Sequence, residues 1–212
     1  NDKIKAYINA RKNSWQDIVT KIEVMFPFGE DLRGIEIIDS PGVCARGGVA
    51  EITSQYIENA DAIIFLKPIS GQALESTQFN QFMENASVER NKNALFLVLT
   101  RATNVTEADL RRLEEEAHKQ FSNLHEENIL IVDSKAELYA KKFSAVENIK
   151  DELNRLHENG TLDDFVRNAY GEIAGIFGTG TTQDFIDKLK EKSRFKQVYD
   201  ALDNFGRKAH YL

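Results

Sequence analysis

The tetrapeptide Asp39-Ser40-Pro41-Gly42 places a carboxylate and a glycine three residues apart, directly after the isoleucine-rich stretch 35–38. A carboxylate at the carboxyl end of a strand can hold a magnesium ion, mostly through water, because Mg²⁺ keeps much of its hydration shell. A glycine has no Cβ, so its backbone N–H can approach a phosphate oxygen closely. The four residues therefore predict part of a site for a magnesium-bound phosphate. The alternative is a plain strand-ending turn, because all four residue types favour turns.

Strand and helix patterns alternate along the first two thirds of the chain and would position this motif. β-Branched or apolar runs predict strands at 18–26, 35–39, 62–66, 94–99 and 128–132. Helices are predicted near 49–59, 74–86 and 106–122, the last starting at Thr106. This order predicts an α/β fold, a three-layer sandwich with a mostly parallel sheet. The first two strands are predicted to pair as one antiparallel hairpin, and ligands of such sheets bind at the carboxyl ends of the strands.

The last third of the chain carries helical patterns only. Helices are predicted at 136–158, 161–176, 182–192 and 194–207. We therefore expect a C-terminal helical elaboration on the α/β fold. The predicted division is an α/β core at 1–142, a helical insertion at 143–192 and a closing helix at 193–212.

Composition excludes several classes of protein. The 212 residues include 27 Lys and Arg against 34 Asp and Glu, for a formal charge of −7, which argues against a nucleic-acid partner. Cys44 is the single cysteine, so the chain has no internal disulfide, and we expect a reducing, cytoplasmic setting. The longest apolar runs fall far short of the roughly 20 residues that span a bilayer.

The tetrapeptide resembles the third motif of GTP-binding proteins, D-x-x-G, in its D-x-P-G form. The likeness extends to Ala60-Asp61-Ala62-Ile63-Ile64-Phe65, to Ser76-Thr77-Gln78-Phe79 and to the stretch 193–202. Over 15–140 and 193–207 the sequence is similar to the GTPase domain of dynamin-like proteins, of the bacterial kind. The resemblance implies a P-loop GTPase-like fold, closed by the C-terminal helix.

That resemblance also implies a function. The full-length protein would bind and hydrolyse GTP with Mg²⁺, associate with itself across the nucleotide face, and remodel or tether membranes from a peripheral position. Asp39 would orient the magnesium ion through water, and the Gly42 N–H would contact the terminal phosphate. The membrane partner rests on the resemblance alone.

Two further segments correspond to the base-binding motifs of the family. The family carries N/T-K-x-D where this chain has Thr100-Arg101-Ala102-Thr103, and a serine–alanine loop where it has Asp133-Ser134-Lys135-Ala136. Arg101 can supply the stem and charge of the usual lysine, but Thr103 cannot replace a carboxylate that accepts two hydrogen bonds from guanine. The resemblance assigns the nucleotide-binding positions, besides Asp39 and Gly42, to Thr100, Arg101, Thr103, Ser134 and Lys135.

The sequence departs from the family in its phosphate loop, because no stretch fits G-x-x-x-x-G-K-[ST]. We therefore expect this chain to begin after that loop, to bind GTP only weakly and to be inactive alone. The central strand of the family would also be missing, and we expect another strand, a second chain or upstream residues outside this numbering to compensate for it. Two alternatives stay open: a GTPase of the translation or septin kind, and a non-catalytic interaction domain with a degenerate GTPase fold.

Overall fold

A computed structural model describes residues 36–39, 57, 59–69, 92–177 and 180–209. The chain divides into two compact units, Asn1–Asp39 and Ser40–Leu212. In the first unit, residues 36–39 have no regular secondary structure and are exposed, Ile37 by 63% and Ile38 by 47%. The strand predicted at 35–39 is therefore not formed over its described residues, because isoleucines that stay in solvent gain no burial to hold a strand. Its hairpin partner at 18–26 and the helix predicted at 74–86 lie outside the described residues.

The second unit contains a parallel three-stranded sheet. Its strands are β1 (Ile63–Pro68), β2 (Leu95–Thr100) and β3 (Ile129–Ile131), in the order β1-β2-β3. Leu66 lies opposite Val98, and Leu99 lies opposite Ile131. The strands predicted at 62–66, 94–99 and 128–132 are thus confirmed, as is the mixed α/β class. This sheet is compatible with a P-loop GTPase-like domain.

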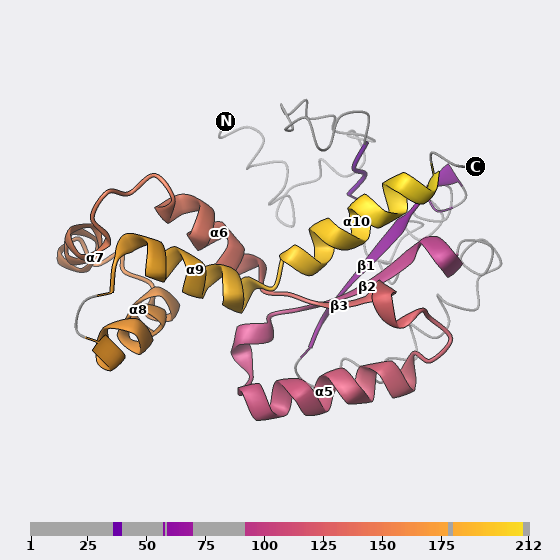
Figure 1. Cartoon of the computed structure of the whole chain (residues 1–212), viewed down its shortest axis with the longest axis horizontal. Helices are drawn as coiled ribbons and strands as arrows, with labels where there is room; N and C mark the ends of the chain where they lie inside the picture. The colour runs from indigo at the N-terminus through magenta and orange to yellow at the C-terminus, as the bar shows by residue number, and fades with distance from the viewer. Residues whose placement is uncertain (1–35, 40–56, 58, 70–91, 178–179, 210–212) are drawn as a thin grey trace, which may run out of the picture. The chain divides into compact units, whose positions relative to one another are not determined.

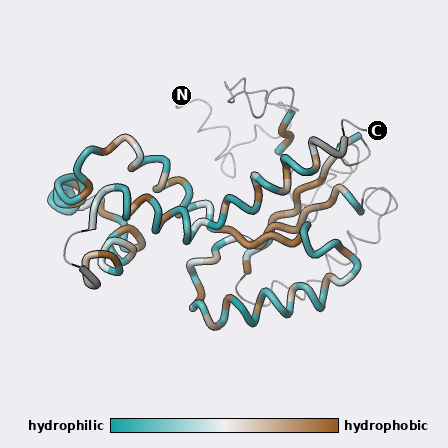
Figure 2. Tube along the Cα trace, viewed as in Figure 1, coloured by the Kyte–Doolittle hydropathy of each residue, from teal (hydrophilic) through white to brown (hydrophobic). Residues whose placement is uncertain are grey.

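β2 is buried on both faces, which explains its uninterrupted apolar sequence. Leu95, Leu97 and Leu99 share a core with α5 (Glu107–Gln120). Phe96 and Val98 share a second core with α10 (Lys196–Ala209). Figure 1 shows α5 and α10 running along the sheet, and Figure 2 shows the strands in hydrophobic colours while both helices are mixed. The predicted helices at 106–122 and 194–207 are confirmed.

Four helices, which we call the helical group, surround a separate core. They are α6 (Ser134–Phe143), α7 (Ile149–Glu158), α8 (Asp164–Phe177) and α9 (Thr182–Ser193). Their core contains Phe143, Phe185 and Leu189, all with no exposed surface. The single helix predicted at 136–158 is wrong, because the chain leaves the helix after Phe143 and Asn148 caps a new one. The helices predicted at 161–176 and 182–192 are confirmed, whereas the domain boundaries stay predictions.

Three short 3₁₀ helices connect the described elements, and one of them, together with α10, satisfies donors at the edge of β3. They are η5 (Lys92–Ala94), η6 (Ala102–Asn104) and η7 (Glu126–Asn128). On β3, the Ile129 N–H donates to the carbonyl of Glu126 in η7. The Ile131 N–H donates to Oε1 of Gln197, on α10, at 3.4 Å. These donors are therefore satisfied on the side of β3 that faces away from β2.

β1 has one buried face and one open face. Ile63 and Lys67 are buried, whereas Ile64 is 46% and Leu66 is 66% exposed. The expected replacement for a missing central strand stays a prediction. Within the described residues, none of the helices has the length and apolar character needed to cross a bilayer.

Candidate functional site

The carboxyl ends of the parallel strands bring two predicted motifs together. Pro68 at the end of β1 lies opposite Thr100 at the end of β2. The segment 100–103 begins with Thr100, the last residue of β2, whose Oγ1 donates to the carbonyl of Lys67 at 3.3 Å. We call residues 100–103 the base-side loop, because the sequence predicts its contact with the nucleotide base. Its position at the strand ends is where open α/β sheets bind ligands.

Arg101 has an unusual backbone conformation in this loop. Its φ of 63° and ψ of 40° lie in the left-handed region, although the residue has a Cβ. That region is unfavourable for an arginine and persists where neighbouring contacts fix it. The side chain of Arg101 is exposed, so the loop presents its charge to solvent.

A buried carboxylate joins the base-side loop to the loop after β3. Asp133 is 3% exposed, and its Oδ2 accepts hydrogen bonds from the Thr103 N–H at 3.1 Å and the Thr103 hydroxyl at 2.5 Å. A backbone bond from the Ala102 N–H to the Val132 carbonyl, at 3.2 Å, runs beside them. Thr103 is therefore held by Asp133, and the two predicted base motifs form one structure.

Ser134 and Lys135 begin α6, immediately after Asp133, and both are exposed. The Lys135 Nζ lies 2.9 Å from a carboxylate oxygen of Asp163 and 5.7 Å from the centre of the Phe165 ring. The hydrogen bond to Asp163 raises the pKa of Lys135, and the same bond lowers the pKa of Asp163. The charge of Lys135 is thus engaged by the helical group at the start of α8.

The phosphate side of the predicted site is less complete in the structure. Asp39 is exposed and belongs to the first unit, and Gly42 lies outside the described residues. Their roles at a magnesium-bound phosphate stay predictions. Among the described residues, no three histidine, cysteine or acidic side chains are grouped so as to hold a metal ion.

A cleft of about 440 Å³ lies elsewhere, beside the start of β3. It is lined by Glu114 and His118 of α5, by η7, and by Asp200 and Asn204 of α10. The cleft is also lined by Asn93 of η5. Because η5 precedes β2 and η7 precedes β3, the cleft lies at the opposite end of these strands from the base-side loop. It therefore supports no role in nucleotide binding.

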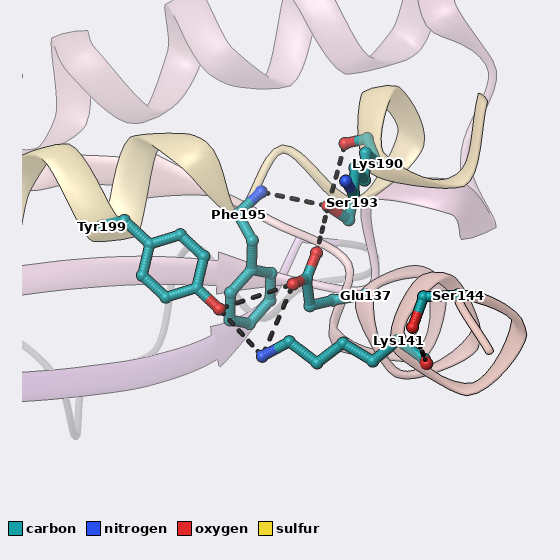
Figure 3. Close-up of polar contacts among 7 residues, drawn as sticks. All are labelled: Glu137, Lys141, Ser144, Lys190, Ser193, Phe195 and Tyr199. Carbon is teal, nitrogen blue, oxygen red and sulfur yellow. Dashed lines mark hydrogen bonds and ion pairs between the residues drawn. The ribbon is translucent and has the colours of Figure 1, made fainter. Parts of the chain in front are cut away.

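A polar junction connects α6 with the end of α9 and the start of α10 (Figure 3). Ser193 Oγ donates to Oε2 of Glu137 at 2.9 Å, and the Phe195 N–H donates back to Ser193 Oγ at 3.2 Å. The other carboxylate oxygen of Glu137 accepts from the Tyr199 hydroxyl at 3.4 Å, and Lys141 lies 3.0 Å from that hydroxyl. The start of α10 is thereby attached to α6.

Sequence reasoning placed Asp133 in the second base motif but did not select it as a site residue. The available signal was local, an aspartate immediately before a helix, where a side-chain oxygen caps backbone N–H groups. The structure confirms that cap, since Oδ1 of Asp133 accepts from the Ala136 N–H at 3.0 Å. Its bond to Thr103, thirty residues away, has no local signature.

One comparison with known proteins gives a match. Residues 1–102 match the model of the dynamin family, in a segment that includes Asp39, Gly42, β1 and β2 and ends in the base-side loop. No curated protein and no solved structure matches the chain. The family match supports a dynamin-family GTPase-like domain in this part of the chain, and the parallel sheet is compatible with it.

Proposed function

We propose that this chain is part of the GTPase domain of a bacterial dynamin-like protein, which binds and hydrolyses GTP with Mg²⁺. The observation that carries the proposal is the dynamin-family match over residues 1–102. The matched segment contains the D-x-P-G motif and both strands that end beside the base-side loop. A nucleotide site at the carboxyl ends of parallel strands agrees with the general rule for α/β sheets.

In this proposal the nucleotide has a phosphate side and a base side. Asp39 orients Mg²⁺ through water, and the Gly42 N–H contacts the terminal phosphate. On the base side, Thr100, Arg101 and Thr103 belong to the base-side loop, which is bonded to the segment that precedes Ser134 at the start of α6. Lys135 contributes less than its position in the motif implies, because Asp163 already pairs with its charge.

The described residues fit GTP and Mg²⁺ only in part. Asp39 has the donor chemistry that Mg²⁺ prefers, and its exposure leaves room for the water shell of the ion. Position 103 carries no carboxylate, and Asp133, the nearest one, is buried and already accepts three hydrogen bonds. A guanine base would therefore lack the bidentate acceptor that the family provides. We derive no hydrolytic step from these residues.

The proposed partners follow from the same family. We propose that the full-length protein associates with itself across its nucleotide face, and that it remodels or tethers membranes as a cytoplasmic, peripheral protein. Both proposals draw on the dynamin-family match, because fold and motif alone do not specify a partner.

Calorimetric titration of Mg·GTP into the natural full-length protein tests the nucleotide proposal. We expect saturable binding that requires Mg²⁺, and we expect Asp39→Asn to weaken it at least about tenfold because the substitution removes the charge that holds the ion. The matched control is Asp151→Asn, an exposed aspartate on α7, which should leave the affinity unchanged. Absence of binding, or equal affinities for both variants, would refute the proposal. The 212-residue chain alone should show no turnover at the rates of the family.

A second candidate is a non-catalytic interaction domain with a degenerate GTPase fold. The observation in its favour is the Thr103–Asp133 pair, in which the Thr103 hydroxyl donates to the Asp133 carboxylate, so that neither group is left open to a base. The two candidates differ in the same titration. Tight, magnesium-dependent binding by the full-length protein removes the non-catalytic reading, and its absence supports that reading.

A further inference from the structure

One buried carboxylate connects the base-side loop to the helical group. Asp133 accepts two hydrogen bonds from Thr103 through Oδ2 and one from the Ala136 N–H through Oδ1. Its own backbone N–H donates to the carbonyl of Ser193, the last residue of α9, at 2.9 Å. Asp133 therefore bonds to three segments at once: the base-side loop, the first turn of α6 and the end of α9.

The chemistry of the carboxylate makes these bonds interdependent. An ionised carboxylate has about four acceptor positions, and three of those on Asp133 are filled by N–H or O–H groups. Hydrogen bonds to a charged acceptor are stronger than neutral ones, and a buried charge that loses a donor is destabilised. Because Asp133 is 3% exposed, water does not replace a lost donor easily. The loop and the helix thus keep each other in place.

The strained backbone of the base-side loop lies within this bonded region. Arg101 is in the left-handed conformation, and the next two residues are both fixed to the loop after β3. Ala102 is fixed through the Val132 carbonyl, and Thr103 through Asp133. Contacts of this kind are what maintain a residue in a sparsely populated conformation. Asp133 therefore binds the segment that directly follows this strained residue.

The polar junction adds a second connection to the same helices. Glu137 lies on α6, one turn after Asp133, and its carboxylate accepts a hydrogen bond from the Ser193 hydroxyl (Figure 3). The Ser193 carbonyl accepts from the Asp133 N–H. Ser193 is 1% exposed, so these bonds are shielded from water. A displacement of α6 relative to the end of α9 would therefore disturb Asp133 directly.

We propose that Asp133 is a positioning residue that couples the helical group to the base-side loop. A movement of the helical group changes the shape of residues 100–103, and a ligand that fixes those residues restrains the helical group in turn. The coupling itself stands on the hydrogen bonds of Asp133. Its consequence for nucleotide affinity rests on the proposed function.

Amide hydrogen exchange of the 212-residue chain tests the coupling. Asp133→Asn retains one acceptor oxygen, which can still cap α6 at Ala136, but its amide group presents a donor toward the Thr103 N–H. We expect exchange at the Thr103 amide to rise at least about tenfold, the effect of losing one charge-assisted hydrogen bond. The α9 core amides should change by less than about twofold.

Three further variants separate coupling from general destabilisation. Asn148→Ala removes the cap of α7 within the same helical group and should leave Thr103 unchanged. Thr103→Val removes only the hydroxyl donor and should give a smaller effect than Asp133→Asn, whereas Thr103→Ser retains the hydroxyl and the protection. Unchanged Thr103 exchange in Asp133→Asn, or an equal rise in Asn148→Ala, would overturn the proposal.

Nucleotide kinetics of the full-length protein supply a separate readout. We expect Asp133→Asn to raise the KM for Mg·GTP with kcat within about twofold of the wild type, because the loop contacts the base and not the reacting phosphate. A fall in kcat at constant KM contradicts this role. If the wild-type protein binds no GTP, the proposed function fails, and the exchange result still decides whether Asp133 couples the two regions.

Discussion

Replacing Phe143 by alanine should open the helical group while the sheet stays folded. Phe143 is completely buried at the end of α6, with its ring centre 5.8 Å from that of Tyr139 and 5.5 Å from that of Phe185. Deleting a buried phenylalanine ring costs about 3–5 kcal/mol of unfolding free energy, since the cavity collapses only partly. Each aromatic contact contributes about 0.5–1.5 kcal/mol in addition to the free energy gained from burying the ring.

The location of the effect follows from the separation of the cores. Phe143 shares its cluster with residues of α6 to α9, whereas the leucines of β2 belong to a cluster with α5. Local opening can therefore occur below the free energy of global unfolding. Hydrogen exchange of Phe143→Ala should accelerate at the core amides of α9 by about a hundredfold or more, and much less at those of β2.

A matched control lies on the same helix. Leu138 is 65% exposed on α6, so Leu138→Ala should change the unfolding free energy by less than about 0.5 kcal/mol. Urea titration followed by circular dichroism gives both values, and exchange gives their location. A loss below about 1 kcal/mol for Phe143→Ala, or equal acceleration in α9 and β2, would refute the independence of the two cores.

Three other substitutions test local features of the helical group. Asn148 caps α7 by accepting from two backbone N–H groups at 3.0 and 3.3 Å, so Asn148→Ala should lower the free energy of unfolding in urea by about 1 kcal/mol. Gly160 follows α7 with a φ of 65° and open space around it. Gly160→Ala should therefore lower the free energy of unfolding by about 1–2 kcal/mol through backbone strain alone. The substitution should lower the Tm, and an unchanged Tm would contradict this reasoning. The hydrogen bond from Lys135 lowers the pKa of Asp163 in the folded state. The pair therefore stabilises the fold at pH values above 3.8, the ordinary pKa of the carboxyl group. This contribution is lost as the pH falls through the lower pKa of the folded state. Asp163→Asn should therefore be less stable than the wild type by under about 1 kcal/mol near neutral pH, since Lys135 is half-exposed. The difference should disappear at pH values below the folded-state pKa of Asp163, as measured by urea titrations across pH.

The strands of the sheet could be predicted because burial requires apolar sequence, on both faces of β2 and on one face of β1. Residues 94–99 show this most clearly, since β2 lies between two other strands and two helices. The stretch 35–39 is also rich in isoleucine, although it includes Glu36 and Asp39, and it forms no strand over its described residues. Strand formation depends on pairing with another strand elsewhere in the chain, and the local sequence pattern does not show whether such a strand is present.

The break between α6 and α7 was hidden by regular spacing. Phe143, Val146, Ile149 and Leu153 recur at steps of three and four residues, which predicts one continuous helix. All four pack in the core of the helical group, although Val146 belongs to the connection and not to a helix. Apolar spacing records which residues are buried, and a short connection that stays on the core satisfies the same spacing as a helix.

Asp133 could not be selected from the sequence because its function in the fold is non-local. Its cap on α6 has a local signature, but its bond to Thr103 depends on β2 and β3 being neighbours in the sheet. The departure at Thr103, by contrast, was visible by comparison with the N/T-K-x-D pattern. The structure adds that the hydroxyl of Thr103 has a partner and is not a free substitute for the family's carboxylate.

The Thr103–Asp133 pair implies that position 103 cannot be considered alone. An aspartate at 103 would bring its carboxylate to the place where the hydroxyl now lies 2.5 Å from Asp133. Two carboxylates at such a distance repel each other, so we expect an aspartate at 103 to separate the loop from α6. The charge that reads guanine in the family and the charge that caps α6 here therefore exclude each other, unless the two residues change together.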